Sequence, residues 1–160
     1  MALVKDTNSY VTRAEADVYF ADRLDATAWN NATDSVKDQA LITATQLLDN
    51  QQFTGYMVSF DQALAFPRVG EYFDPRVGSV VIFESDVVPD RIITANYEMS
   101  LHLLNNSGLM DDTGTVKSLV VGDIELEYIR NPSKIPSIVD QFIQPLLTHA
   151  SISNQWFRAN

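Results

Sequence analysis

Four stretches of this chain place apolar side chains three and four residues apart, the spacing of one face of an α-helix. They cover residues 12–24, 33–50, 89–105 and 136–147. The third stretch is apolar on more than one narrow stripe, which indicates a helix buried on two sides, as at the centre of a bundle. The fourth contains Pro145, which should kink the helix or end its regular part. The periodicity therefore predicts a mainly α fold, a small bundle of about four helices.

Capping residues mark the predicted helix starts. Thr12 precedes Glu15 by three positions, which is the spacing of a capping box. Thr33 or Asp34 can cap the second helix. Pro89 suits the first position of the third helix, where the N–H that proline lacks is not needed.

A β-hairpin insertion is predicted at residues 116–129. Two alternating segments, 117–121 and 124–128, flank Gly122-Asp123, and a first-position glycine is typical of a two-residue type II′ turn. This register pairs Val121 with Ile124, Leu119 with Leu126, and Lys117 with Tyr128. One apolar face then contains Leu119, Val121, Ile124, Leu126 and Tyr128. Because a two-stranded ribbon is only marginally stable alone, this face must lie on the bundle or on a neighbouring subunit.

The connection between residues 53 and 88 is predicted to be long and irregular, because it is interrupted by glycine and proline. Residues 80–83 form a candidate short strand within it. Its aromatic residues, like Trp29 between the first two helices, have two interpretations: they pack as core, or they bind a partner such as the bases of a nucleic acid. The aromatic residues of the connection are Phe53, Tyr56, Phe60, Phe66, Tyr72 and Phe73.

A chain of 160 residues is expected to form one domain. We assign residues 1–148 to a helical domain and residues 149–160 to an extended C-terminal tail. The tail is polar except for Ile152, Trp156 and Phe157, which either fold back as core or dock on a partner. No apolar run approaches the roughly 20 residues that span a bilayer, so no membrane partner is expected.

The residues for most known chemistries are missing. There is no cysteine, and the two histidines, His102 and His149, lack metal-ligand spacing. No phosphate-binding glycine loop or serine-nucleophile motif occurs. His102 lies in a predicted buried helix, where a structural role is the simpler interpretation. We therefore expect no enzyme activity, no catalytic residue, no cofactor and no metal.

Several short motifs occur in a set order: Ser9-Tyr10-Val11, residues 14–20, Trp29, and the stretch 62–68 ending in Phe66-Pro67-Arg68. In this order they resemble the head–tail connector proteins of tailed bacteriophages, also called adaptor or head-completion proteins, some of which carry the label DnaT-like. That family has Trp more often than Phe before the Pro-Arg pair. The signature residues carried over from the resemblance are Tyr10, Trp29, Phe66, Pro67, Arg68, Gly122 and Tyr128.

The resemblance implies a structural virion protein of the capsid vertex, or neck, that is made in the bacterial cytoplasm. About twelve copies would form a ring by head-to-tail contacts beneath the portal protein. The ring would extend the DNA channel, let double-stranded DNA pass without specific binding, and dock tail or neck completion proteins. Related connectors reach the portal with their C-terminal segment, which places Trp156, Phe157 and Arg158 at the portal contact.

The alternative is a single-stranded DNA-binding accessory protein of replication. Such a protein needs a basic groove with aromatic side chains on which bases stack. Here 11 basic residues are scattered among 21 acidic ones, for a net charge of −10. This balance disfavours the alternative, because affinity for nucleic acid comes largely from Lys and Arg that neutralise phosphates.

Overall fold

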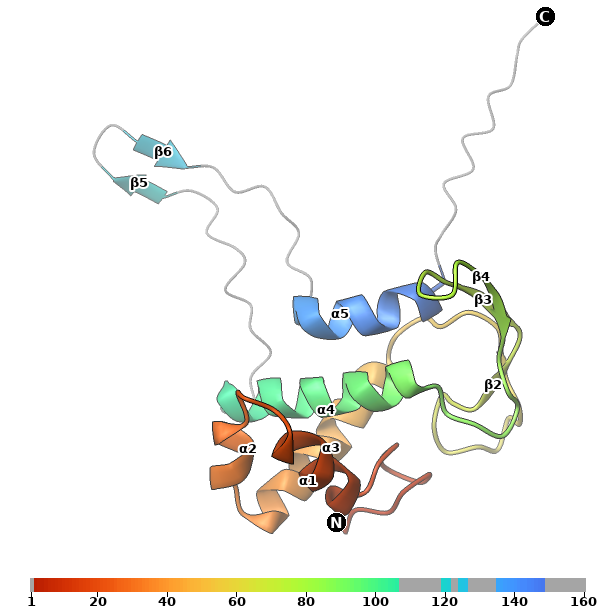
Figure 1. Cartoon of the computed structure of the whole chain (residues 1–160), viewed down its shortest axis with the longest axis horizontal. Helices are drawn as coiled ribbons and strands as arrows, with labels where there is room; N and C mark the ends of the chain where they lie inside the picture. The colour runs from red at the N-terminus through yellow and green to blue at the C-terminus, as the bar shows by residue number, and fades with distance from the viewer. Residues whose placement is uncertain (1, 107–118, 122–123, 127–134, 149–160) are drawn as a thin grey trace, which may run out of the picture.

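The computed structural model describes residues 2–106, 119–121, 124–126 and 135–148, and it shows a mainly α fold with small antiparallel strand pairs (Figure 1). The helices are α1 (Arg13–Ala21), α2 (Thr27–Asn31), α3 (Asp34–Asp49), α4 (Asp90–Asn105), α5 (Ser137–Ile143) and the 3-10 helix η1 (Gln144–Leu146). The paired strands are β1 (Tyr56–Met57) with β2 (Arg68–Val69), β3 (Glu71–Asp74) with β4 (Ser79–Ile82), and β5 (Leu119–Val121) with β6 (Ile124–Leu126). The predicted fold class is confirmed.

Helix α4 is the centre of the helical body. It packs against α3 on one side, against α5 on another, and against α2 near its C-terminal end (Figure 1). Ile92, Ala95, Met99 and Leu103 are all buried, and so are polar residues between them. Burial on several sides explains the wide apolar distribution in the sequence of this segment, and the prediction of a central helix is confirmed.

An arginine–aspartate–arginine cluster fastens the β3–β4 pair to the start of α4. The Nη2 of Arg91 donates to Oδ1 of Asp74 over 2.7 Å, and the Nη2 of Arg76 donates to the other carboxylate oxygen over 3.0 Å. Asp74 and Arg91 are buried, whereas the Arg76 side chain is 65% exposed. The hydrogen bonds from Arg91 and then Arg76 hold the pKa of Asp74 well below its usual range.

Two more polar residues of α4 bind neighbouring helices. Glu98 is buried and accepts a 2.5 Å hydrogen bond from the Tyr19 hydroxyl, together with an ion pair from Arg23. Asn96 donates through Nδ2 to the hydroxyl of Thr45 on α3 over 2.8 Å. Because an unpaired buried polar group is costly, these bonds specify how the chain around α1 and helix α3 sit on α4.

The chain between α1 and α3 differs from the prediction. The first helix ends at Ala21, and Leu24, expected on its apolar face, is fully exposed. The five-residue helix α2 follows, and it is too short to leave a periodic signal in the sequence. Trp29 of α2 is buried, with its ring 4.6 Å from that of Phe20 and its Nε1 donating to Asp17 over 2.8 Å. Its interpretation as a core residue is confirmed.

The helix ends agree with most of the capping predictions. Thr12 and Glu15 form the capping box at α1. Helix α3 starts at Asp34 after Thr33, although the Thr33 side chain makes no capping hydrogen bond. Pro89 is the residue before α4 and not its first helical residue, which corrects the prediction by one position. Pro145 lies in η1, so the regular part of the last helix ends before it, as predicted.

The connection between α3 and α4 is more ordered than predicted. The expected strand at 80–83 is observed as β4, and it pairs with β3, which was not predicted. A second, two-residue pair joins β1 and β2. Gly55 has φ 72°, and a Cβ there would lie 2.3 Å from the Val69 carbonyl oxygen, so this close crossing requires glycine. Strands of two to four residues leave too little alternation to be recognised in a sequence.

The predicted hairpin is confirmed where the structure describes it. Strands β5 and β6 pair Leu119 with Leu126 and Val121 with Ile124, which is the expected register. Its turn, Gly122-Asp123, and its outer pair, Lys117 and Tyr128, lie outside the described residues.

Replacing Asp74 with Ala should lower the free energy of unfolding by about 3 kcal/mol at neutral pH, because it leaves the buried Arg91 guanidinium without its carboxylate. A carboxyl whose pKa is lowered by folding stabilises the fold above its unfolded pKa and loses that effect as the pH falls through the folded value. The difference between Asp74→Ala and the parent should therefore shrink below about pH 4. Urea unfolding at neutral pH and at about pH 3 measures both values.

Asp61→Ala is the matched control, because Asp61 is an exposed residue of the same connection. Its effect should stay within about 0.5 kcal/mol at either pH. An Asp74→Ala cost that does not change with pH would contradict the lowered pKa.

Candidate functional site

Arg68, one of the signature residues, links distant parts of the connection between α3 and α4 through hydrogen bonds to backbone carbonyls. Its guanidinium lies 5.7 Å from the Phe66 ring centre and donates to the backbone, with 2.6 Å from Nη2 to the Gly55 carbonyl oxygen. The planar fork of donors suits several carbonyl acceptors at once. The carbonyls that accept from Arg68 are those of Phe53, Thr54, Gly55 and Ala65.

Tyr10 and Phe66 form the adjoining part of the core. The Tyr10 hydroxyl donates to the carboxylate of Asp49 at the end of α3, and burial raises the pKa of both groups. The Phe66 ring is edge-on to Tyr10, with 6.4 Å between ring centres, and the Phe66–Pro67 peptide bond is cis. Like Trp29, these signature residues are part of the core and form no open site.

The other residues singled out in the sequence lie outside the described residues. They are the signature residues Gly122 and Tyr128 and the expected portal contacts Trp156, Phe157 and Arg158. The assignments of these residues stay predictions.

Every lysine and arginine that the structure describes already has an acidic or carbonyl partner. Arg68 binds carbonyls, and the other six form ion pairs. The ion pairs are Lys5–Glu15, Arg13 with Asp34 and Asp38, Arg23–Glu98, Lys37–Asp17, and Asp74 with both Arg76 and Arg91. Within the described residues, no lysine or arginine is left without such a partner to neutralise phosphate, so this part of the chain offers no basic groove.

The aromatic residues of the connection divide into two groups. Phe53 and Phe66 are buried, and Tyr72 stacks on buried Phe83 with 4.9 Å between ring centres, as the core interpretation predicts. Tyr56, Phe60 and Phe73 are exposed, so the core interpretation does not hold for these three, and contact with a partner stays a prediction.

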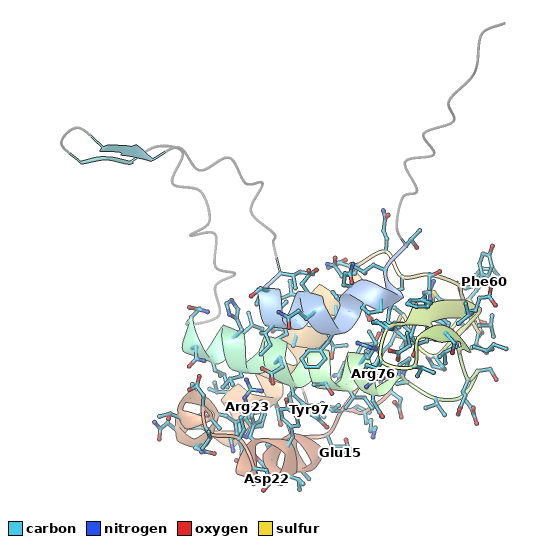
Figure 2. The ribbon with its side chains drawn as sticks, turned by 45° about the horizontal axis from the view of Figure 1, so that its top comes forward. Glu15, Asp22, Arg23, Phe60, Arg76 and Tyr97 are labelled. Carbon is cyan, nitrogen blue, oxygen red and sulfur yellow. The ribbon has the colours of Figure 1, made fainter. Side chains whose placement is uncertain are left out.

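The outer face of the β3–β4 pair carries exposed apolar side chains that were not predicted from the sequence. Phe73 lies opposite Val80, and Ile82 lies next along the same face, opposite Glu71. We call Phe73, Val77, Val80 and Ile82 the strand patch; each of them is more than half exposed. Figure 2 shows the fully exposed Phe60 at the same end of the molecule. Exposed apolar side chains gathered in this way are typical of protein interaction surfaces.

The described residues contain neither a candidate metal site nor a candidate membrane-spanning helix. No group of three or more His, Cys, Asp or Glu in this part of the chain could hold a metal ion. Of the helices described, none is both long enough and apolar enough to cross a membrane.

The fold and surface define a small, mainly α-helical protein. Its described lysines and arginines all have partners, and its β3–β4 pair exposes apolar side chains. The chain belongs to the family described as "Putative DnaT-like ssDNA binding protein", whose model matches residues 2–159. No curated protein and no solved structure matches the chain. The family description agrees with the alternative hypothesis, single-stranded DNA binding, and none of the comparisons supports the head–tail connector.

Replacing Arg68 with Lys should lower the free energy of unfolding by about 2 kcal/mol, because one ammonium cannot reach all the carbonyls that the guanidinium fork serves. Chemical unfolding with tryptophan fluorescence measures the change. Arg76→Lys is the matched control, since that side chain is mostly exposed and a change within about 0.5 kcal/mol is expected. Equal effects at the two positions would contradict the structural role of Arg68.

Proposed function

We propose that this chain is a non-enzymatic assembly protein that acts through contacts with other proteins, and specifically that it is a head–tail adaptor of a tailed bacteriophage. In this role several copies form a ring under the portal protein, extend the DNA channel and dock the next tail or neck component. Double-stranded DNA passes through without specific binding.

One observation carries the preference for protein contacts: the described cations are used within the fold, while apolar strand side chains are left on the surface. Nucleic-acid affinity requires cations free to replace counterions around phosphates. Protein interfaces gain their stability mainly from desolvated apolar and aromatic groups. The surface described therefore suits a protein partner better than a polynucleotide.

The narrower assignment to an adaptor is supported by the order of the sequence motifs. The signature residues Tyr10, Trp29 and Phe66 all belong to the hydrophobic core, and Arg68 lies over the Phe66 ring, so these motifs contribute to the fold. The net charge of −10 would let a ring line a DNA channel without retaining the duplex.

Single-stranded DNA binding is the second candidate, and the family description favours it. Its cations would have to come from outside the described residues, where four basic residues remain. These are Lys117, Arg130, Lys134 and Arg158.

The two candidates differ in how the purified chain responds to single-stranded DNA. With a fluorescent oligothymidine, we expect no salt-sensitive rise in anisotropy, because the described cations are already paired. Tight binding that weakens steeply with salt would reject the proposal in favour of the second candidate. Joint replacement of Lys117, Arg130, Lys134 and Arg158 by Ala should then abolish that binding.

Deletion of residues 149–160 should leave the melting temperature unchanged and abolish binding to the portal protein of the same phage, since the tail is expected to supply the portal contact. Co-sedimentation with purified portal measures the binding. Trp156→Ala combined with Phe157→Ala is the finer variant, and Ile152→Ala in the same tail is its control. Normal portal binding by the truncated chain would remove the tail from the interface, and absence of the protein from purified particles would reject the adaptor itself.

A further inference from the structure

The β5–β6 hairpin is a two-stranded ribbon that joins no larger sheet among the described residues. Its register places Leu119 opposite Leu126 and Val121 opposite Ile124. Because opposed residues of an antiparallel pair share a face and successive pairs alternate, these four apolar residues belong to one face of the ribbon. A two-stranded ribbon is marginally stable alone in water and needs a second layer on its apolar face.

The β3–β4 pair, which carries the strand patch, is a second ribbon of the same kind. One of its faces turns inward, where Asp74 is buried and Tyr72 stacks on buried Phe83. Phe73 and Val80 lie opposite each other on the outer face, which is exposed. Two sheets can pack face to face about 10 Å apart and cover each other's apolar side chains. Each ribbon therefore has the surface that the other one needs.

The two ribbons are attached at opposite ends of the helical body. The hairpin follows α4 after Asn106 and returns to the body at Ile135, just before α5. The β3–β4 pair is fastened to the first turn of α4 by the bond between Arg91 and Asp74, and β3 also contacts η1, beyond the end of α5 (Figure 1).

This separation favours a second copy as the partner of the hairpin. Helix α4 has 16 residues and is about 24 Å long. The shorter link between hairpin and body, residues 127–134, spans at most about 29 Å. To cover the strand patch of its own copy, the hairpin would have to carry this link along most of α4, which costs conformational entropy. A second copy can bring its strand patch to the end of α4 where the hairpin is attached.

We propose that the β5–β6 hairpin of one copy docks on the strand patch of a second copy, so that the two ribbons form one small sandwich across the contact. This inference rests on the proposed assembly of several copies, and it names the segment and the surface that would join them. Because the hairpin and the strand patch are different parts of the chain, each copy can give one hairpin and receive another.

The contact is small compared with a standard protein interface, which takes about 20–30 residues from each side. A single contact of this kind should therefore be weak in dilute solution. In an assembly each copy makes the contact twice, once with its hairpin and once with its strand patch, so the whole assembly is held more firmly than one pair. Concentrated protein and a covalent trap are needed to detect one contact.

The chain has no cysteine, which permits a direct test by cross-linking. Val121→Cys on the hairpin and Val80→Cys on the strand patch are prepared as separate full-length variants, mixed at high concentration and treated with a short bis-maleimide. We expect several-fold more covalent dimer than either variant gives alone. Val18→Cys mixed with Val121→Cys is the matched control, because Val18 is an exposed valine of α1 outside the strand patch.

A chain with both Val80→Cys and Val121→Cys shows which copy the hairpin covers. A head-to-tail contact gives a ladder of covalent oligomers, and a reciprocal two-fold contact stops at the dimer. Either product supports docking on a second copy, and the dimer alone would overturn the ring. A product that stays monomeric with an internal cross-link at every protein concentration means that the hairpin covers its own copy, and this would overturn the proposal.

Removing apolar side chains gives an independent readout in the same cross-linking mixture. Phe73→Ser combined with Ile82→Ser on the strand-patch variant should reduce the covalent dimer several-fold, and so should Leu119→Ser on the hairpin variant. Leu24→Ser is the control, because it removes a fully exposed leucine away from the strand patch and should leave the yield unchanged. Melting temperatures close to that of the parent exclude loss of folding as the cause.

Failure of this contact and failure of the adaptor function are distinguishable. Dimers no more abundant than in the control mixture, or unaffected by the serine substitutions, would overturn the docking of the hairpin. If that happens while purified particles contain the protein as a ring, the adaptor function stands and only this contact is wrong. If the cross-link forms as expected but the protein is absent from particles, the contact stands and the adaptor function fails.

Discussion

Three buried polar side chains of α4 determine how the rest of the chain is arranged. Arg91 binds Asp74 of the β3–β4 pair, Asn96 binds Thr45 of α3, and Glu98 binds Tyr19 and Arg23 at α1. Arg91 and Glu98 are about 10 Å apart along the helix axis, so the strands and α1 are held at separate levels of one helix. Apolar side chains can pack in many arrangements of similar stability. A buried charge, in contrast, is stable only in an arrangement that supplies its partner.

The same bonds have a consequence for the surface. Because Arg23 and Arg91 neutralise buried acids, and Arg68 serves backbone carbonyls, these cations contribute to folding and are withdrawn from solvent. The acids left over at the surface, such as Asp22 and Asp25, keep the chain strongly negative. An acidic surface is a poor match for a polynucleotide, and it restricts favourable contacts to partners that bring apolar groups or an exposed cation.

The sequence predicted most of the helical body because long helices leave a long signal. Helices α3 and α4 each have 16 residues, enough for the apolar period and the flanking caps to agree. The hairpin register was also predictable, since Gly122-Asp123 sits between alternating strands. The strand patch and the exposure of Leu24 could not be predicted from the sequence. They depend on β3 pairing with β4 and on α1 ending at Ala21. Both are decided by contacts distant in sequence, from Arg91 to Asp74 and from Glu98 to Arg23.

The exposure of Leu24 follows from the same contacts. A continued α1 would bury Leu24 on the apolar face that carries Ala16 and Phe20. The chain instead leaves the helix at Asp22, so that Arg23 reaches Glu98, and Leu24 is exposed beside Asp22 and Asp25. The bond that fixes α1 on α4 thus also exposes Leu24. The Arg91–Asp74 bond acts in the same way, because it holds Asp74 inward and leaves Phe73 and Val80 of the strand patch on the outer face. The buried polar bonds of α4 therefore decide which apolar side chains are left at the surface as well as how the elements pack.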